Sequence, residues 1–330
     1  MGEERAHEFE LIERYLAPLA TDPGSVGLVD DAAVLTPVEG EDLVLTKDAL
    51  AADIHFFAVD PAGAIARKAL RVNLSDLAAK GARPVGYLLG LALAPDWSER
   101  WVADFCAGLK ADQEAYGFPL YGGDTIKVKA GPVLSVTAIG AVPKGTAVRR
   151  SAARAGDALY VTGTIGDAAL GLALRHEPAK AERWGLGEAE SGHLLKRYLL
   201  PEPRNAVAEA VRLYARASMD ISDGLVGDLA KMASSSGVGA AVDLDAVPLS
   251  RAAALAVKDE AAFIAAMTGG DDYELLVAVA PEKTEAFEAA VAESGVALSR
   301  IGRMEAGARV AYRRGGEVYD FGAAAGYSHF

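Results

Sequence analysis

Hydrophobic and polar residues alternate along the chain with two periods, which separate predicted strands from predicted helices. Residues 98–116 carry apolar side chains at helical spacing, whereas residues 85–93 form a short apolar run typical of a buried strand. The same succession of strands and helices continues to the C-terminal region, with strands expected at 43–48, 131–142, 158–162, 240–244 and 275–280 and helices at 7–17, 61–81, 204–216 and 282–294. This alternation predicts an α/β or α+β fold.

The length of the chain and a Pro/Gly-containing segment near its middle predict two domains. The chain has 330 residues, of which 51% are hydrophobic, enough for more than one core. Pro143-Lys144-Gly145 follows a long predicted strand and forms a natural boundary. We therefore expect an N-terminal domain over residues 1–145 and a C-terminal α/β domain over residues 146–330.

An acidic turn between a strand and a helix is the most distinctive local feature. Asp220 and Asp223 lie within Met219–Leu225, where an apolar start runs into Ser222, a predicted helix N-cap. Two carboxylates this close repel each other unless a cation lies between them. The alternative is a capped helix with a solvated acidic start, and a single turn does not decide between the two.

Other carboxylates repeat this placement at the ends of strands or the starts of helices. The set comprises Asp30, Asp31, Asp48, Asp76, Asp124, Asp220 and Asp223. Singly, each is more typical of a cap or turn. Together, in a chain without a Cys/His cluster, they favour a hard cation, and Mg²⁺ is the one that joins carboxylates, water and phosphates.

Composition narrows the classes of partner. Asp and Glu outnumber Lys and Arg by 46 to 33, a net charge of −13, which argues against nucleic acid and anionic membrane surfaces. An anionic substrate would need metal ions as intermediaries. The longest apolar run, residues 85–94, is too short to span a bilayer, and the start of the chain lacks a signal-peptide pattern. The single cysteine, Cys106, lies among apolar helix positions, so we expect a core residue in a reducing cytoplasm.

Six ordered motifs spread over nearly the whole chain resemble the thiamine-monophosphate kinase family, within the superfamily of aminoimidazole ribonucleotide synthetase and selenophosphate synthetase. The motifs are Asp30-Asp31-Ala32, Asp48 followed by His55-Phe56, the segment from Lys68 to Ala79, Gly122-Gly123-Asp124-Thr125, Asp220-Ile221-Ser222-Asp223-Gly224-Leu225, and Gly269-Gly270-Asp271-Asp272-Tyr273-Glu274-Leu275.

The resemblance implies ATP-dependent phosphorylation of thiamine monophosphate to thiamine diphosphate, in a homodimer whose N-terminal sheets form a barrel. It also implies roles for individual residues. Metal positions would be Asp31, Thr46, Asp48, Asp76, Asp124, Asp220 and Asp223, of which Asp76 and Asp220 would matter most for catalysis. ATP contacts would be Gly123, Asp124, Arg150 and Ser222, and thiamine phosphate contacts His55, Asp271 and Phe321.

Several positions depart from the family pattern, including extra residues between Phe321 and Tyr327 that bear on the Phe321 assignment. Lys47 stands where Thr is common, so only its backbone could serve as a metal ligand. Asp271 replaces a Glu and shortens the reach of the carboxylate by one methylene. Thr125-Ile126-Lys127 replaces a Thr-Thr-Arg run, which removes a possible phosphate fork but keeps a positive charge.

The residues themselves agree with this chemistry, although other interpretations stay open. A phosphate monoester oxygen is already ionised near neutral pH, so phosphoryl transfer to it needs no general base, and no Ser-His-Asp or Cys-His pair is evident. His55 could instead be a packed histidine, Phe321 a core aromatic and Arg150 part of a solvated linker. The rival functions are another ATP-dependent ligase or synthetase of the same superfamily and a non-catalytic nucleotide sensor.

Overall fold

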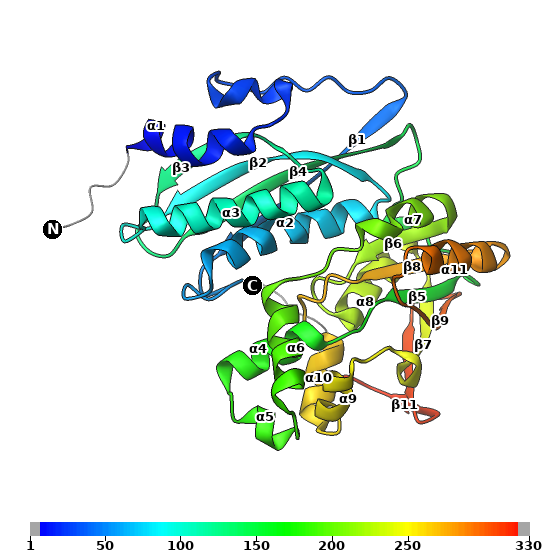
Figure 1. Cartoon of the computed structure of the whole chain (residues 1–330). Helices are drawn as coiled ribbons and strands as arrows, with labels where there is room; N and C mark the ends of the chain where they lie inside the picture. The colour runs from blue at the N-terminus through cyan, green and yellow to red at the C-terminus, as the bar shows by residue number, and fades with distance from the viewer. Residues whose placement is uncertain (1–6, 323–330) are drawn as a thin grey trace. The chain divides into compact units, whose positions relative to one another are not determined.

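The computed structural model describes residues 7–322 and divides the chain into two compact units (Figure 1). The first contains the residues up to Leu77 and Arg83–Gly145, and the second contains Ala78–Ala82 and the residues from Thr146 on. The short segment 78–82 therefore belongs to the second unit although it lies inside the first in sequence. Each unit has its own sheet.

The first unit is built on a mixed four-stranded sheet within the described residues. Its strands are β1 (Glu41–Ala51), β2 (Arg83–Leu93), β3 (Leu120–Lys127) and β4 (Val133–Pro143), in the order β1-β4-β2-β3. Strand β4 pairs antiparallel with β1 and with β2, whereas β2 and β3 run parallel. The parallel pair is joined through a helix, as a crossover between parallel strands requires.

Two long helices cover one face of this sheet (Figure 1). They are α2 (Ala62–Ala79) and α3 (Glu99–Tyr116). Ser98 caps the start of α3 by accepting from the N–H of Trp101, and Gly117 ends it in the left-handed region. Near the start of the described chain, the expected helix over 7–17 is present as a continuous helical stretch made of α1 (Glu8–Leu11), a π-helical turn (Ile12–Leu16) and a 3₁₀ turn (Ala17–Leu19), and a separate 3₁₀ segment follows at Pro23–Leu28.

The second unit contains a seven-stranded sheet within the described residues. The strands are β5 (Ala158–Thr162), β6 (Ala215–Asp220), β7 (Gly239–Asp243), β8 (Leu275–Val279), β9 (Leu298–Glu305), β10 (Val310–Arg314) and β11 (Glu317–Tyr319). Their order is β11-β10-β7-β9-β5-β8-β6. Only β7 and β10 pair in parallel; the other neighbours are antiparallel.

Helices pack on both faces of the second sheet. The larger core lies against α4 (Asp167–His176), α6 (Glu188–Leu199), α8 (Leu225–Ser236), α9 (Arg251–Ala256) and α10 (Glu260–Thr268), with the short α5 (Lys180–Arg183) beside them. The smaller core, around Tyr160 and Val277, lies against α7 (Ala208–Tyr214) and α11 (Thr284–Glu293). Successive residues of β5 and β8 thus enter opposite cores, which explains why these strands are apolar throughout.

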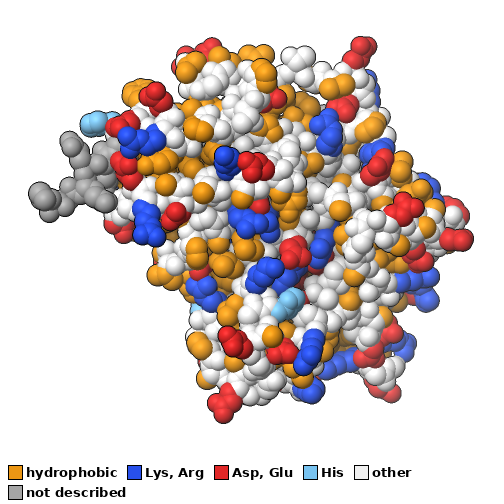
Figure 2. Space-filling view, in the orientation of Figure 1, with side chains coloured by type: hydrophobic (Ala, Val, Ile, Leu, Met, Phe, Trp, Pro, Cys, Tyr) orange, Lys and Arg blue, Asp and Glu red, His pale blue; other side chains and the backbone are white. Residues whose placement is uncertain are grey.

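The predicted two-domain mixed α/β fold is confirmed, but the expected N-cap at Ser222 is wrong. Helix α8 begins at Leu225 after Gly224, whose φ of 98° suits glycine, and no side chain caps it. No helix of residues 7–322 has both the length and the apolarity that a membrane span requires. Acidic and basic side chains are interspersed over the face shown in Figure 2.

Candidate active site

Strand β1 of the first unit presents candidate ligands toward helix α2. The hydroxyl of Thr46 donates a hydrogen bond to Oδ2 of Asp76, and the backbone N–H of Asp48 donates to Oδ1 of Asn73 at 3.2 Å. Thr46 and Asp48 are two residues apart, so they lie on the same face of the strand. The β1–α2 packing therefore brings Thr46, Asp48 and Asp76 together from positions 28 to 30 residues apart.

The side chain of Lys47 lies on the opposite face of the sheet. Its ammonium donates to Ser135 Oγ at 2.6 Å and to Thr137 Oγ1 at 3.4 Å, both on β4. Alternate residues of a strand face opposite sides, so the Lys47 side chain points away from Thr46 and Asp48. Only the backbone of Lys47, and not its side chain, can therefore serve as a metal ligand beside Thr46 and Asp48.

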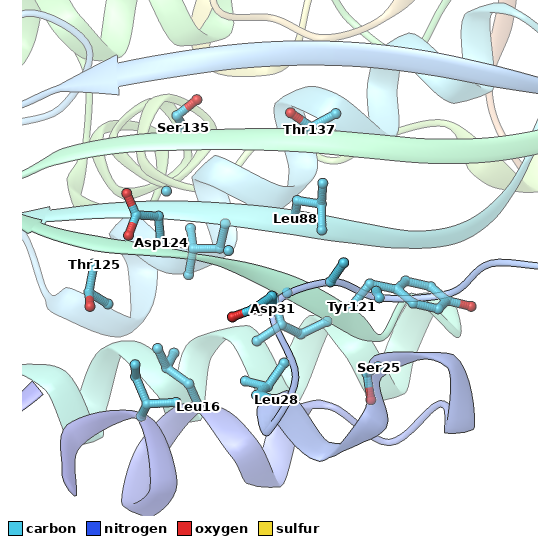
Figure 3. Close-up of a pocket in the computed structure, with 18 of the residues that line it drawn as sticks. Leu16, Ser25, Leu28, Asp31, Leu88, Tyr121, Asp124, Thr125, Ser135 and Thr137 are labelled. Atoms are coloured by element: carbon cyan, nitrogen blue, oxygen red, sulfur yellow. The ribbon is translucent and has the colours of Figure 1, made fainter. Parts of the chain in front are cut away.

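A cavity of about 770 Å³ lies over this second face of the sheet (Figure 3). Its lining includes Asp31 on the loop after the 3₁₀ segment Pro23–Leu28, Asp124 on β3, and Lys47. The register aligns Asp124 with Gly90 of β2 and Gly90 with Ser135 of β4, so these positions form one row across the floor. The cavity thus has one ammonium, several hydroxyls and four carboxylates on its walls, the carboxylates being those of Glu8, Asp30, Asp31 and Asp124.

Glycine at 123 is required by close strand packing. A Cβ on Gly123 would lie 1.9 Å from the carbonyl oxygen of Leu89, whereas one on the neighbouring Gly122 would come no closer than 3.5 Å to another side chain. Gly123 therefore permits the close approach of β3 to β2 that carries Asp124 to its position.

His55 takes part in a local hydrogen-bond network of the first unit. Its Nδ1 accepts from the N–H of Ala51 at 3.1 Å, and its backbone oxygen accepts from the buried Lys68 ammonium at 2.9 Å. The first of these bonds fixes the tautomer so that Nε2 carries the proton when the ring is neutral. A contact between His55 and substrate stays a prediction.

In the second unit, the two motif loops are bonded to each other through their backbones. Asp220 ends β6 and is 7% exposed. Beyond it, the N–H of Ile221 donates to the oxygen of Glu274, and the N–H of Asp271 donates to the oxygen of Ser222, at 2.8 and 2.9 Å. These cross-bonds place the loop that carries Asp271 beside the loop that carries Asp220 and Ser222.

Asp271 is held in an unusual backbone conformation. Its φ is +74° and that of Tyr273 is +52°, both in the left-handed region that non-glycine residues rarely adopt. The Tyr273 hydroxyl donates to Oδ1 of Asp271 at 3.3 Å. Such a conformation persists only where the surroundings impose it.

Two buried acidic residues, Asp272 and Glu274, anchor this loop. Asp272 accepts from the N–H groups of Gly166 and Ala168 at 2.6 and 3.2 Å. Burial raises the pKa of Asp272 well above its ordinary value, although these two N–H groups act in the opposite direction. The sequence placed Asp272 and Glu274 in the motif without assigning them a role.

Glu274 is the centre of a buried ion-pair network. Its carboxylate accepts from Arg197 at 2.9 Å and from Arg204 Nε at 2.6 Å, and it also accepts from the hydroxyl of Thr162 at 2.7 Å. Glu274 is 0% exposed. The partners come from β5, α6 and the segment before α7, so spacing along the sequence could not reveal them.

Asp223 is paired with a lysine of the helix that follows it. Lys231 on α8 donates to Asp223 and, at 2.9 Å, to the fully buried Asp228, whose other oxygen accepts from the N–H of Asp223 at 2.9 Å. Burial raises the pKa of Asp228, while the Lys231 ammonium and the Asp223 N–H oppose that shift. Sequence analysis identified Asp223 but missed Lys231.

Arg150 and Phe321 lie in very different surroundings. Arg150 is exposed, and its backbone oxygen accepts from Ser236 Oγ at 3.1 Å. Phe321 is 9% exposed and packs against Phe263, Tyr312 and Tyr319, with ring centroids 4.8 to 6.3 Å apart. The core interpretation of Phe321 thus accounts for its burial, and its contact with substrate stays a prediction.

The chemistry of the candidate metal ligands suits Mg²⁺. All are oxygen donors, and Mg²⁺ commonly uses one or two carboxylates and completes its shell with water and substrate phosphates. Across residues 7–322 no three Cys, His, Asp or Glu side chains form a ready-made metal-binding group. The Thr46–Asp76 pair and the carboxylates of Asp31 and Asp124 fit partial ligand sets of this kind.

Comparisons with known proteins show which family this chain resembles over most of its length. The N-terminal domain of the AIR synthase related proteins matches residues 29–142, and their C-terminal domain matches residues 154–314. The thiamine-monophosphate kinase of Caulobacter vibrioides is 41% identical over 317 residues, which cover 94% of this chain and 88% of that protein. The chain belongs to the thiamine-monophosphate kinase family.

Solved structures of the thiamine-monophosphate kinase family share the fold. The enzyme of Stenotrophomonas maltophilia K279a superposes with a TM-score of 0.83 at 39% identity, covering 94% of this chain and 98% of that one. AaThiL, complexed with AMPPCP and TMP, superposes with a TM-score of 0.76 at 30% identity and covers 100% of both chains. The family predicted from the six motifs is therefore confirmed.

Proposed function

We propose that this chain transfers the γ-phosphoryl group of ATP directly to thiamine monophosphate, giving thiamine diphosphate and ADP. The observation that carries the proposal is the full-length match to AaThiL, a relative bound to AMPPCP and TMP. The chain also carries the six motifs that resemble the thiamine-monophosphate kinase family. It is therefore an ATP-dependent kinase in which the thiamine phosphate is the acceptor.

In the first unit, we assign Mg²⁺ and nucleotide phosphates to the oxygen ligands around β1 and β3. Thr46, Asp48 and Asp76 would hold metal on the helix-covered side, and Asp31 and Asp124 would do so beside the cavity. Bound Mg²⁺ would neutralise the negative charge of the phosphates. The cavity wall next to Gly123 would accept the nucleotide, because glycine lets a ligand approach the backbone closely.

In the second unit, we assign metal and phosphate contacts to the loop after β6 and substrate contacts to the loop before β8. Asp220 and Asp223 would bind Mg²⁺, and Ser222 and Arg150 would contact ATP. Asp271 would attract the cationic thiazolium ring. The positive φ of Asp271 supports this role, since strained backbone clusters at functional sites. His55 and Phe321 remain our candidates for packing about the substrate.

The proposed reaction needs no proton acceptor from the protein. The attacking phosphate oxygen is ionised near neutral pH. The residues therefore act by positioning two anionic substrates and balancing their charge, which is the main catalytic demand of phosphoryl transfer. A protein of net charge −13 can do this only if cations lie between its carboxylates and the substrates.

An assay with ATP, thiamine monophosphate and Mg²⁺, with products separated by chromatography, tests the proposal. We expect thiamine diphosphate and ADP in equal amounts. A ligase or synthetase would release inorganic phosphate in the presence of its own substrates, and a nucleotide sensor would bind ATP without consuming it. Absence of thiamine diphosphate at saturating substrate concentrations would overturn the proposal.

We further propose that the chain acts as a homodimer whose first-unit sheets form a barrel. Leu45, Leu88 and Ile126 are 64%, 38% and 53% exposed. All three lie on the sheet face opposite α2 and α3, because they share strand alternation with Lys47 and Asp124. An apolar sheet face of this kind favours burial against a second copy. Light scattering of the wild type and of Leu45→Glu tests this: the variant should shift toward monomer.

We place this activity in a reducing cytoplasm. The support is the single cysteine, Cys106, which is 6% exposed among apolar side chains of the first unit. Localisation of a fluorescent fusion of the chain in intact bacterial cells, compared with a periplasmic control, tests it.

A further inference from the structure

Lys231 forms a compact charge cluster with two carboxylates of the same segment. Its ammonium donates to Asp223 and Asp228, and the Asp228 carboxylate also accepts the backbone N–H of Asp223. Asp228 is 0% exposed, whereas the side chains of Lys231 and Asp223 are 40% and 33% exposed. The cluster thus has a buried end at Asp228 and a solvent-accessible end at Asp223.

We propose that Lys231 is a positioning residue that occupies the Asp223 carboxylate until a divalent cation displaces it. The inference rests on the proposed function, in which Asp223 is a metal ligand. Lys231 then sets the Mg²⁺ concentration at which Asp223 becomes available. The ammonium would keep its bond to Asp228 and release Asp223.

Electrostatics explains why such a residue is useful. Asp220 ends β6 and Asp223 follows three residues later on the loop, and two neighbouring carboxylates repel each other when no cation lies between them. The lysine supplies one positive charge on a flexible stem that can withdraw into solvent, whereas Mg²⁺ supplies two charges and holds its ligands rigidly. Lys231 therefore stabilises the metal-free loop and competes with metal for the same oxygen.

The test must separate the effect of the Lys231–Asp223 ion pair from that of the Lys231–Asp228 ion pair. Asp228→Asn provides the background, because the amide oxygen can still accept the Asp223 N–H while the buried charge is removed. The Lys231 ammonium has then lost its acceptor at position 228, so its remaining effect on metal binding is through Asp223. In this background Lys231→Met removes the ammonium, Lys231→Arg retains a positive charge, and Lys258→Met removes an exposed lysine elsewhere in the second unit. Binding of Mn²⁺ alone, without nucleotide, is measured by electron paramagnetic resonance of the free ion, and Tm is measured with and without Mg²⁺.

We expect Lys231→Met to tighten Mn²⁺ binding by roughly fivefold, because breaking a partly exposed ion pair changes a binding constant by about that factor. Its Tm should fall without metal and recover at saturating Mg²⁺. Lys231→Arg and Lys258→Met should both retain the affinity of the background variant.

Three results would overturn the inference. The first is unchanged Mn²⁺ affinity with an equal fall of Tm in both conditions, which would make Lys231 a purely structural residue. The second is weaker binding in Lys231→Met, which would mean that the lysine assists the metal or its ligands. The third is unchanged Mn²⁺ binding in Asp223→Asn. Because Mn²⁺ binding is read without substrates, failure of the inference is distinguishable from failure of the kinase assay.

Discussion

Thr46 on β1 donates a hydrogen bond to the carboxylate of Asp76 on α2, although the two residues are 30 positions apart. The hydroxyl has two lone pairs left to offer, and the carboxylate keeps its other oxygen. The pair therefore orients two oxygen ligands from two different elements. Such pre-organisation is what a Mg²⁺ site needs before nucleotide binds.

Asp76→Asn and Asp220→Asn should each lower turnover by orders of magnitude, because an amide cannot neutralise clustered Mg²⁺. The fold should persist, and loss of carboxylate repulsion should maintain or raise the Tm of the metal-free protein. Steady-state kinetics with circular dichroism measures both effects. The control is Asp104→Asn on α3, an exposed carboxylate paired only loosely with Arg100 at 3.8 Å. Turnover near that of the wild type in Asp76→Asn or Asp220→Asn would make that residue structural.

Gly123→Ala should impair nucleotide binding far more than Gly122→Ala. The added Cβ at 123 would collide with the Leu89 carbonyl oxygen, so β3 must move away from β2, whereas position 122 has room. We expect the KM for ATP to rise about tenfold or more in Gly123→Ala, with a lower Tm. Equal kinetics in the two variants would show that the strand spacing does not matter for ATP.

Asp271→Asn should raise the KM for thiamine monophosphate and leave that for ATP nearly unchanged, because the carboxylate is expected to attract the thiazolium cation. Asp271→Glu, which restores the longer side chain of the family, should be tolerated. The KM values of both variants are measured by steady-state kinetics with each substrate varied in turn. If the KM for thiamine monophosphate does not change in Asp271→Asn, Asp271 serves only the turn.

Glu274→Gln should destabilise the second unit strongly. The substitution removes the buried carboxylate that compensates Arg197 and Arg204 and leaves them the half-exposed Glu202 at 3.4 and 3.7 Å, a loss of about 3 kcal/mol in the free energy of unfolding. Urea denaturation of the full chain measures it. Glu282→Gln removes an exposed partner 3.8 Å from Arg216 and should cost less than about 1 kcal/mol. Comparable losses in the two variants would contradict the central role of Glu274.

Cys106 should react slowly with iodoacetamide in the native protein. Burial raises the pKa of its thiol to about 12, which favours the protonated and unreactive form. The native alkylation rate should therefore rise about tenfold per pH unit between pH 8 and pH 10, whereas the rate in urea should level off above the ordinary thiol pKa of about 8.5. A native rate that levels off near pH 9 would contradict the raised pKa.

The sequence by itself determined which residues could carry the chemistry. Continuous apolar runs predicted β5 and β8 closely, and the acidic turn predicted after β6 is present at Asp220, whereas Asp48 and Asp124, expected to end strands, lie within β1 and β3. These signals are local, because strand alternation and turn chemistry depend on neighbouring residues. The six motifs were sufficient to predict the family.

Only the tertiary structure decided which side chains meet and how they are oriented. Strand β4 lies between β1 and β2, so Lys47 meets Ser135 across 88 positions, and β1 packs on α2, so Thr46 meets Asp76. The predicted N-cap at Ser222 failed because Gly224, rather than Ser222, precedes the first helical residue. Contacts of this kind arise from sheet order and helix packing, which minimise the free energy of the whole chain and leave no periodic trace in any one segment.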